Sequence, residues 1–482
     1  MKKSILILNI ITFTLIGLSI KAQVPHFWGM TAGYSYEFAF SIYQINADGT
    51  SYQQGVYNYE CGEAYGKLVK ASDNNFYGLI RGYNGCGGGL FKFDPVTNVF
   101  TGVHDLASLN IDFPYGNVTM ANNGKLYGTA PQGIPPSQRG GIFSYDINSN
   151  QTTLVYSFDT TCLTGCASSG SLLLANNGLL YGINHGGANG YGVIFSFDPT
   201  TNLYSDLYNM DSINGNGSIY NSLIQSSNGF LYGMTSQSGT SNDGVIFSFD
   251  ISTNTYTKLV DFTGSNGAAP SGTPLEVNDS LLYGLTSMGG TENAGVIYCY
   301  NINSNTYNVV HNFDTLTGNI NPRGSLIQAS NGKLYGTTGN ISSYLDSIGN
   351  SIFQFDPVNN TYTDIFNFVV GINGTNGFGP GDLMESPLTS GIQAITNKEE
   401  VSIYPNPTSG TFTLSYNSQF SLLNSQLKIY DVLGEQVYSQ AINNPNQTTI
   451  NISQMSNGVY FYEIKSGLQI PTSIRGKFIV EK

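Results

Sequence analysis

Charged side chains are scarce in this sequence. They make up 10% of the 482 residues, and 31 acidic residues stand against 18 basic ones, which gives a net charge of −13 at pH 7. Such a surface repels nucleic-acid phosphates and anionic lipid, and no basic cluster with interleaved aromatics is present. Nucleic acid is therefore not an expected partner, and low charge with abundant Gly, Asn, Ser, Thr and Tyr favours short strands and tight turns over long helices.

Long apolar runs are absent except at the N-terminus. Two lysines precede an apolar run from Ile5 to Ile20, and the small residue Ala22 lies just before an expected cut ahead of Gln23. This pattern predicts a signal peptide over residues 1–22. A membrane anchor is the alternative, disfavoured by the short run and the turn-rich sequence that follows. No later stretch approaches the roughly 20 apolar residues of a span, so no transmembrane segment is expected in the mature chain.

Cysteine is rare, with five residues in the chain. Export would place them where disulfides form, and the expected pairs are Cys162 with Cys166 and Cys61 with Cys86. Cys299 falls within a predicted strand and is expected to be a small core residue. Metal binding is the competing interpretation, which the lack of Cys-x-x-Cys spacing or a nearby His disfavours.

Motifs of known catalytic chemistry are also missing. We find no His-Glu-x-x-His, no Gly-x-Ser-x-Gly, no phosphate loop, no calcium loop of the helix-loop-helix kind and no sialidase Asp box. The four histidines, His26, His104, His185 and His311, are scattered and are expected to be structural or solvated. Paired carboxylates for glycoside hydrolysis could still meet in space. The sequence therefore predicts no cofactor, no metal and no catalytic residue.

An apolar residue, an aromatic and a glycine recur seven times at spacings of 49 to 54 residues. The aromatics are Trp28, Tyr77, Tyr127, Tyr181, Tyr232, Tyr283 and Tyr335. Each copy holds four short β-prone pieces, for example residues 324–329, 333–338, 352–356 and 361–368. Four antiparallel strands in about 50 residues are typical of a β-propeller blade, with a parallel β-helix as the alternative.

The third piece of each copy ends in Asp or Asn. These residues are Asn46, Asp94, Asp146, Asp198, Asp250, Asn301 and Asp356. Each opens a hairpin segment in which its side chain can accept hydrogen bonds from nearby backbone N–H groups. We expect these residues to cap turns, in preference to the alternative of a ring of metal ligands.

The first copy lacks its first piece. Elsewhere this piece places a Gly eleven residues before the aromatic, as at Gly66 and Gly324, with Asn221 substituting once. Residues 381–386 resemble this piece and have no aromatic-Gly segment after them. They are therefore expected to complete the first blade and to close a seven-bladed propeller over residues 23–386, which leaves no exposed sheet edge.

The Leu-Tyr-Gly, Gly-Val-Ile-Phe-Ser-Phe-Asp and Asn-Gly elements resemble the GloVer tandem repeats of bacterial surface proteins. The resemblance covers residues 27 to about 386, and copies one and two are the most divergent. It implies a location at a bacterial surface and says little about chemistry.

After a predicted linker over residues 387–400, the pattern changes. Alternating residues over 401–482 predict a small Ig-like β-sandwich, so the whole chain is expected to be all-β. The motif residues are Tyr404, Pro405, Asn406, Pro407, Gly410, Gly434, Gly458 and Tyr460. This segment resembles the type A C-terminal sorting domain of the type IX secretion system.

That resemblance implies the type IX machinery as a partner and a route in a Gram-negative bacterium through the periplasm to the outer surface or the medium. In that family the domain is generally removed and the cargo is often attached to lipopolysaccharide.

The loops between second and third pieces vary most, for example residues 130–139, 236–243 and 287–293. In a meander these loops share one face of the ring, and variable loops on a rigid scaffold are where binding tends to occur. The first hypothesis is a surface-displayed scaffold for adhesion to extracellular glycan or protein. The alternatives are a secreted glycan lyase or glycoside hydrolase, and a passive surface-layer protein.

Overall fold

A computed structural model describes most of the chain. The described residues are 24–32, 39–58, 62–64, 66–82, 88–109, 111–112, 114–133, 140–158, 161–163, 165–166, 170–216, 222–315, 320–339, 350–368, 378–386, 401–416, 425–432, 434–442, 447–465 and 473–482. The chain divides into two compact units, Met1–Leu388 and Thr389–Lys482. The predicted signal peptide, the predicted linker and the pair Cys61 and Cys86 lie outside the described residues.

Within the described residues, the strands of the first unit pair into seven antiparallel sheets of four or five strands, numbered here as blades one to seven. Blades one to three contain β1 (His26–Ala32), β2 (Ala39–Asn46), β3 (Gln53–Asn58), β31 (Phe378–Pro380) and β32 (Met384–Ser386); β4 (Gly62–Glu63), β5 (Val69–Lys70), β6 (Phe76–Gly82), β7 (Gly89–Asp94) and β8 (Val99–Asp105); and β10 (Thr119–Met120), β11 (Lys125–Ala130), β13 (Gly141–Asp146) and β14 (Gln151–Ser157).

Blades four to seven have four strands each. They contain β15 (Leu173–Leu174), β16 (Leu180–Asn184), β17 (Val193–Phe197) and β18 (Tyr204–Asn209); β19 (Ile224–Gln225), β20 (Leu231–Thr235), β21 (Val245–Asp250) and β22 (Thr255–Asp261); β23 (Ala268–Val277), β24 (Leu281–Met288), β25 (Val296–Asn301) and β26 (Thr306–Asn312); and β27 (Pro322–Gln328), β28 (Leu334–Thr338), β29 (Ser351–Asp356) and β30 (Thr361–Asn367). A 3-10 helix, η1 (Leu106–Leu109), and the paired strands β9 (Ile111–Asp112) and β12 (Gln132–Gly133) complete this unit.

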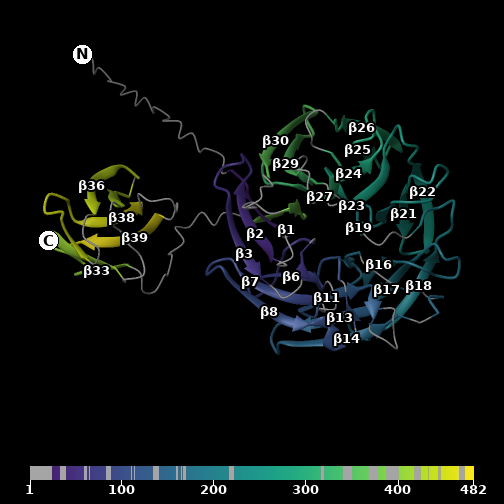
Figure 1. Ribbon diagram of the computed structural model, residues 1–482, viewed down its shortest axis with the longest axis horizontal. Coiled ribbons are helices and arrows are strands. Elements are labelled where there is room, and N and C mark those ends of the chain that lie inside the picture. Colours follow the sequence, from purple (N-terminus) through teal and green to yellow (C-terminus); the bar gives the residue numbers. More distant parts are fainter. Residues whose placement is uncertain are drawn as a thin grey trace, which may run out of the picture. The chain divides into compact units, whose positions relative to one another are not determined.

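Each blade is a meander, as in the order β15-β16-β17-β18. Figure 1 shows the sheets following one another around a common centre, with β19, β23 and β27 on the inside and β18, β22 and β26 toward the outside. The prediction of an all-β chain with a propeller is confirmed. The blade count of seven stays a prediction, because parts of the chain lie outside the described residues.

The C-terminal end of the repeat region completes blade one, as expected from the sequence. Strand β32 pairs with β1 in the register His26 with Ser386 and Trp28 with Met384. The Gly381 N–H donates to the Met30 carbonyl at 2.8 Å. Blade one is therefore built from both ends of the first unit, so the ring has no free edge strand at this seam.

The core lies between neighbouring blades. Between blades two and three, for example, Tyr77 and Leu79 pack in one cluster with Phe143 and Tyr145. At the closing seam, blade-one residues Phe27, Tyr43, Ile45 and Leu383 share a cluster with Tyr335, Ile352 and Phe368 of blade seven. Stability therefore comes from sheet-on-sheet contacts repeated around the ring.

The aromatic-Gly motif has a steric cause in the structure. The aromatic after each repeat's apolar residue is buried, whereas the glycine lies under a ring from the adjacent third strand. A β-carbon on Gly182 would lie 2.5 Å from Phe195 Cζ, closer than real contacts allow. The same register pairs Gly29 with Tyr43, Gly78 with Phe91, Gly128 with Phe143, Gly182 with Phe195, Gly233 with Phe247, Gly284 with Tyr298, and Gly336 with Phe353. Glycine is required there for space.

Turns at one end of each blade are fixed by side-chain hydrogen bonds. In four blades an Asn four residues before the motif tyrosine donates to its hydroxyl, as from Asn228 to Tyr232 at 2.8 Å, whereas in blade two the Tyr77 hydroxyl donates to Asp73. The Asp or Asn that ends the third strand accepts from backbone N–H groups two or three residues later, as Asp94 does from Val96 and Thr97. The same holds for Asp146, Asp198, Asp250, Asn301 and Asp356. The turn-capping prediction is confirmed for these six positions.

These caps predict an acid-sensitive contribution to stability. Hydrogen bonds from Ser252 lower the pKa of Asp250, and the bond from the Val358 N–H lowers the pKa of Asp356. Because the folded pKa is lowered, this contribution is fully present above the ordinary Asp pKa of about 3.9 and is lost as the pH falls through the folded value. Asn accepts the same bonds without titrating, so the double variant Asp250→Asn, Asp356→Asn should lose fewer degrees of Tm than the parent between about pH 6 and about pH 3. Thermal unfolding followed by circular dichroism measures this, and equal losses would contradict it.

The second unit is a two-layer sandwich. One sheet contains β33 (Val401–Tyr404), β34 (Thr411–Tyr416) and β37 (Gln447–Asn451), and the other contains β35 (Ser425–Tyr430), β36 (Gln436–Ile442), β38 (Gly458–Lys465) and β39 (Ser473–Val480). Phe412 and Leu414 of the first sheet share a buried cluster with Ile429 and Phe478 of the second. This is the sandwich predicted from the alternation of apolar residues.

The predicted motif residues of this unit fall at its turns and in its core. Tyr404 is exposed, and cis peptide bonds join it to Pro405 and join Asn406 to Pro407. The Asn406 carboxamide oxygen accepts from the Ile479 N–H at 2.9 Å. The remaining motif residues include two turn glycines at positive φ, Gly410 and Gly434, the start of β38 at Gly458, and buried Tyr460. The Tyr-Pro-Asn-Pro opening therefore lies against the last strand.

Candidate functional site: the loop face and inner wall

Two sets of loops meet at one end of the blades. In a meander, the loop from the second to the third strand and the loop leading to the next blade leave from the same end. The structure joins them: the Gly290 N–H donates to the Gly264 carbonyl, and the Thr315 hydroxyl donates to Glu292 at 2.8 Å. We call this end the loop face. The expectation that the variable loops share one face is confirmed for the described parts of these loops.

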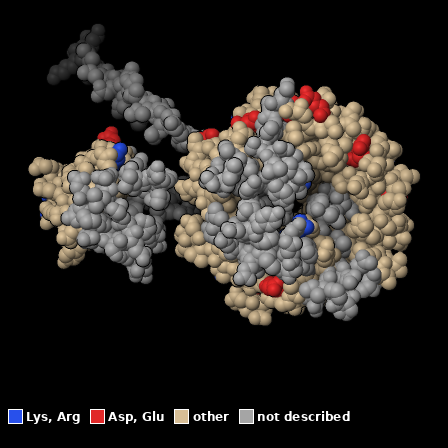
Figure 2. Space-filling view, in the orientation of Figure 1, with Lys and Arg blue, Asp and Glu red and all other residues tan. Residues whose placement is uncertain are grey.

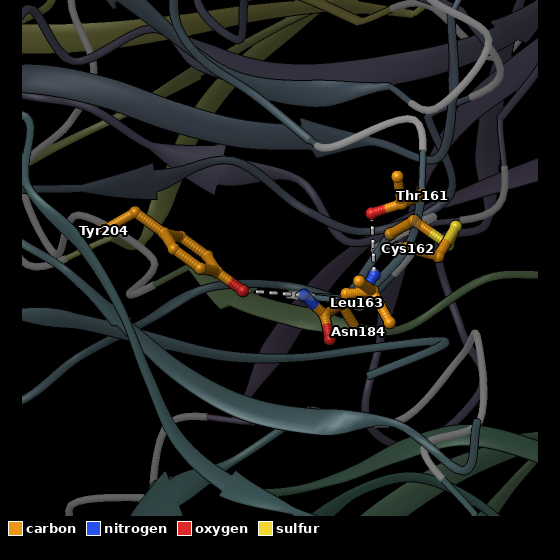
Figure 3. Close-up of a disulfide and its surroundings, with 6 residues drawn as sticks. Thr161, Cys162, Leu163, Asn184 and Tyr204 are labelled. Atoms are coloured by element: carbon orange, nitrogen blue, oxygen red, sulfur yellow. Dashed lines mark hydrogen bonds between the residues drawn. A yellow bond between two sulfur atoms is a disulfide. The ribbon is translucent and has the colours of Figure 1, made fainter. Parts of the chain in front are cut away.

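A disulfide lies in one of these loops. Cys162 and Cys166 are joined, with their Cα atoms 5.1 Å apart, in the connection from blade three to blade four (Figure 3). The backbones of Cys166 and His185 exchange two hydrogen bonds of 2.6 and 2.8 Å. Beside this loop, the buried Asn184 amide donates to the Tyr204 hydroxyl at 2.9 Å, drawn as a dashed line in Figure 3. The disulfide thus closes a short loop, and the backbone bonds to His185 hold that loop against the variable loop of blade four.

The inner wall carries a belt of hydrogen bonds that the sequence analysis did not find. It is formed by the residue that follows each first-strand Gly or its Asn substitute, and we call it the axial belt: Lys67, Asn117, Ser171, Ser222, Thr273, Ser325 and Asp382. At five of the seven steps a backbone N–H donates to the side chain of the next blade, as from Ser171 to Ser222 at 2.8 Å. In five of the seven copies the sequence shows this signal as an Asn, Ser or Thr after the first-strand Gly or its Asn substitute.

The first-strand glycines are needed because the blades come so close here. A β-carbon on Gly272 would lie 1.9 Å from the Gly324 carbonyl oxygen, and one on Gly324 would lie 1.9 Å from an Asp382 oxygen. Both glycines also have φ near +75°. This packing brings the axial-belt residues of neighbouring blades into direct contact.

The belt closes on two opposite charges. Asp382 accepts from the Ser325 N–H at 2.7 Å, and burial raises the pKa of its carboxyl, partly offset by that bond and by attraction to Lys67. Asp382 keeps some solvent-accessible surface although protein atoms surround it deeply, as expected for a group on the wall of the ring's interior. An acid of blade one and a base of blade two thus occupy neighbouring positions of the belt.

Two arginines lie close to the belt on the loop face. Arg323 directly precedes Gly324 on β27 and is exposed. The Arg81 guanidinium lies 4.6 Å from the ring centroid of Tyr115, the residue before first-strand Gly116. In Figure 2 the blue Lys and Arg atoms of the visible ring face lie near its centre, whereas the red acidic atoms lie toward its rim. On this face, the visible Lys and Arg atoms thus lie closer to the centre of the ring than the visible acidic atoms do.

The four histidines of the sequence lie in four different blades. His26 bonds Gln44 and Asn46, His104 bonds Ser108, and His185 contributes its backbone to the disulfide loop. The ring of His311 stacks on Tyr362 with 4.2 Å between centroids, and burial lowers the pKa of this histidine. In the part of the chain that the structure describes, no group of three or more His, Cys, Asp or Glu is arranged to hold a metal ion.

The remaining sequence-based site residues have structural places. Cys299 is free and buried, and burial raises the pKa of its thiol. The motif tyrosines point into the interfaces between blades, and Trp28 takes their place in blade one against Phe76 and Phe93, with centroids 5.5 Å away in each case. They are scaffold residues.

Comparison with known families matches this architecture. The model of the Gloeobacter/Verrucomicrobia repeat matches residues 16–186 and 168–390, and that of the secretion system C-terminal sorting domain matches residues 402–481. The chain belongs to the Gloeobacter/Verrucomicrobia repeat family and ends in a type IX sorting domain. It is therefore a secreted or outer-surface protein that uses the type IX secretion machinery, as the sequence indicated. No helix in the described ranges is long and apolar enough to cross a membrane.

Solved structures resemble the chain only distantly. The extracellular domain of a putative one-component system from B. thetaiotaomicron is 14% identical, with a TM-score of 0.49, over 93% of this chain and 62% of its own. TolB from Acinetobacter baumannii is 11% identical with a TM-score of 0.39, over 74% and 82%. An oligogalacturonate lyase in complex with manganese is 12% identical with a TM-score of 0.44, over 72% and 86%. The chain thus spans about three-fifths of the first of these, and no curated protein matches its sequence.

Proposed function

We propose that the repeat unit is a binding scaffold that contacts glycan or protein outside the cell through its loop face. The observation that carries this proposal is the difference between the two ends of each blade. The turns at one end repeat nearly the same capping residues, whereas the loops at the other end differ in length and sequence. Repetition supplies a rigid support, and the variable end supplies specificity.

A binding array of glycans and extracellular proteins, probed with the full chain, tests the proposal. A reducing-sugar release assay on the same polysaccharides runs in parallel. Saturable binding without product is the expected result. Release of reducing sugar would contradict the scaffold proposal and favour a glycan lyase or hydrolase. No signal in either assay would favour a passive surface-layer protein.

A matched control separates the loop face from the rest of the ring. Lys258 pairs with Asp261 at 2.8 Å and donates to the Ile213 carbonyl, so it ties an outer strand to the loop of the preceding blade. The variant Lys333→Gln changes the opposite end of a blade. We expect loop-face variants at Lys258 to change array binding more than Lys333→Gln does.

A further inference from the structure

The outer strands of six blades share one irregularity. In blades two to seven, an extra residue lies on the fourth strand at the same place in its pairing with the third strand. The shift follows Leu90, Ile142, Ile194, Ile246, Ile297 and Ile352. Such a β-bulge bends the strand and interrupts the row of N–H and C=O groups on its outer edge. Bulges of this kind protect an edge strand from pairing with another chain.

Blade one lacks this bulge. Its strands β2 and β3 form six consecutive pairs without a shift, which end with Gln44 opposite Gln53. Where the other blades have the extra residue, Ile42 pairs with Gly55 and the neighbouring pair follows directly. Closure at the seam pairs β1 with β32, but β3 is the last strand of its sheet, and among the described residues it pairs with β2 alone. Figure 1 shows β3 on the outer side of blade one, where it offers a regular edge.

Neither charge nor proline protects this edge. Strands β1, β2 and β3 contain no Lys, Arg, Asp, Glu or Pro. Four of the six bulged outer strands, in contrast, carry an acidic residue: Asp105, Asp206, Asp261 and Asp364. Bulges, charged side chains and prolines are the usual means of blunting an edge strand. Because β3 has none of the three, its sequence leaves the edge able to pair.

The charge of the ring indicates which strand fits this edge. Residues 23–388 contain nine Lys or Arg against 25 Asp or Glu, so two copies of the ring repel each other over most of their surface. At blade one, the strands bring no charge against each other. An uncharged edge also has no group that attracts a charged peptide, whereas a second copy of β3 is a neutral strand of the same length. Antiparallel pairing of two identical strands is self-complementary about a two-fold axis.

We propose that two copies of this protein associate through antiparallel pairing of their β3 strands, which joins two blade-one sheets into one continuous sheet. This inference goes beyond the proposed binding function and does not depend on it. A contact between two six-residue strands is smaller than a standard interface of about 1,600 Å², so the association is weak and depends on concentration. Where copies are crowded on a surface, the pair presents two loop faces, and binding to a repetitive ligand gains from avidity.

Sedimentation velocity of the full chain between about 1 µM and about 500 µM tests the proposal. A reversible monomer–dimer equilibrium is the expected result. Raising the salt from about 50 mM to about 500 mM should strengthen the dimer, because salt screens the repulsion between the acidic rings. Hydrogen exchange at both ends of the concentration range should show protection of residues 53–58 that grows with concentration. A monomer throughout, or a dimer without this protection, would overturn the proposal.

Gln53→Lys is the main variant, because Gln53 is exposed at the start of β3 and the lysine places a charge on the edge of each copy. It should weaken the dimer by about tenfold or more and leave Tm nearly unchanged. Thr153→Lys is the matched control. Thr153 is also exposed and pairs with Ser144 as Gln53 pairs with Gln44, but it lies on a bulged strand.

Both variants change the net charge by the same amount, so a difference between them reports the place of the charge. The control should dimerise as strongly as the parent. A dimer that Gln53→Lys leaves unchanged, or that both variants weaken equally, would contradict pairing through β3.

Discussion

Replacing Gly233 by alanine is expected to lower the free energy of unfolding by about 1–3 kcal/mol, although alanine is the better residue for most regular structure. The new β-carbon would lie 2.5 Å from Phe247 Cζ and 2.8 Å from Leu223 Cδ2. Both neighbours are buried, so neither can move aside into solvent. Urea unfolding followed by fluorescence measures the change.

A double-mutant cycle shows whether the ring of Phe247 is the cause. Phe247→Leu alone should destabilise the protein by loss of buried surface. Together with Gly233→Ala, it should cost about 0.5–3 kcal/mol less than the sum of the single changes, because the shorter side chain leaves space for the methyl group. Strictly additive losses would show that the glycine is needed for another reason.

A chain that ends after residue 377 should fail to form a stable ring, whereas one that ends after residue 388 should unfold at nearly the same temperature as the full chain. The shorter chain lacks β31 and β32, so β1 keeps β2 but loses both partners on its other edge. It also lacks Leu383, which is 1% exposed in the closing cluster, and the Asp382 carboxylate that Ser325 bonds. Thermal unfolding and size-exclusion chromatography of the two chains measure the difference.

Leu383→Ala in the full chain provides a milder version of the same change. Removal of most of this side chain from the cluster should cost about 2–5 kcal/mol. A chain ending at 377 that melts with the longer one, or a Leu383→Ala variant as stable as its parent, would show that the seam is not needed for the fold.

The repeat made the fold predictable, because one pattern is written seven times. Turn caps such as Asp94, the meander order and the closure by residues 381–386 all follow from positions that recur at a fixed spacing. The sandwich was equally accessible, since Phe412 and Leu414 alternate as a half-buried strand requires. The fold of a chain with a single copy of each pattern would have been much harder to predict.

The candidate site was less accessible because its residues do not recur. Arg323, Lys67 and Arg81 occupy different positions in different copies, so no spacing relates them. Only the fold places blades seven, one and two side by side. The axial belt was hard to predict for another reason, since a small polar residue after a Gly has many ordinary explanations in turns and loops.

Blade one imposes an order on folding. The Met30 carbonyl and the Gly381 N–H that bonds it are about 350 residues apart in the sequence, so this contact has one of the longest loops to close in the molecule. Blades two to seven can each form from local hairpins as the chain lengthens. The strands β1 to β3, made first, must wait with an open edge until almost the whole repeat unit exists. Until then, the unpaired edge of β1 is open to pairing with a strand of another chain. The unfinished chain therefore depends on factors that keep exported chains apart.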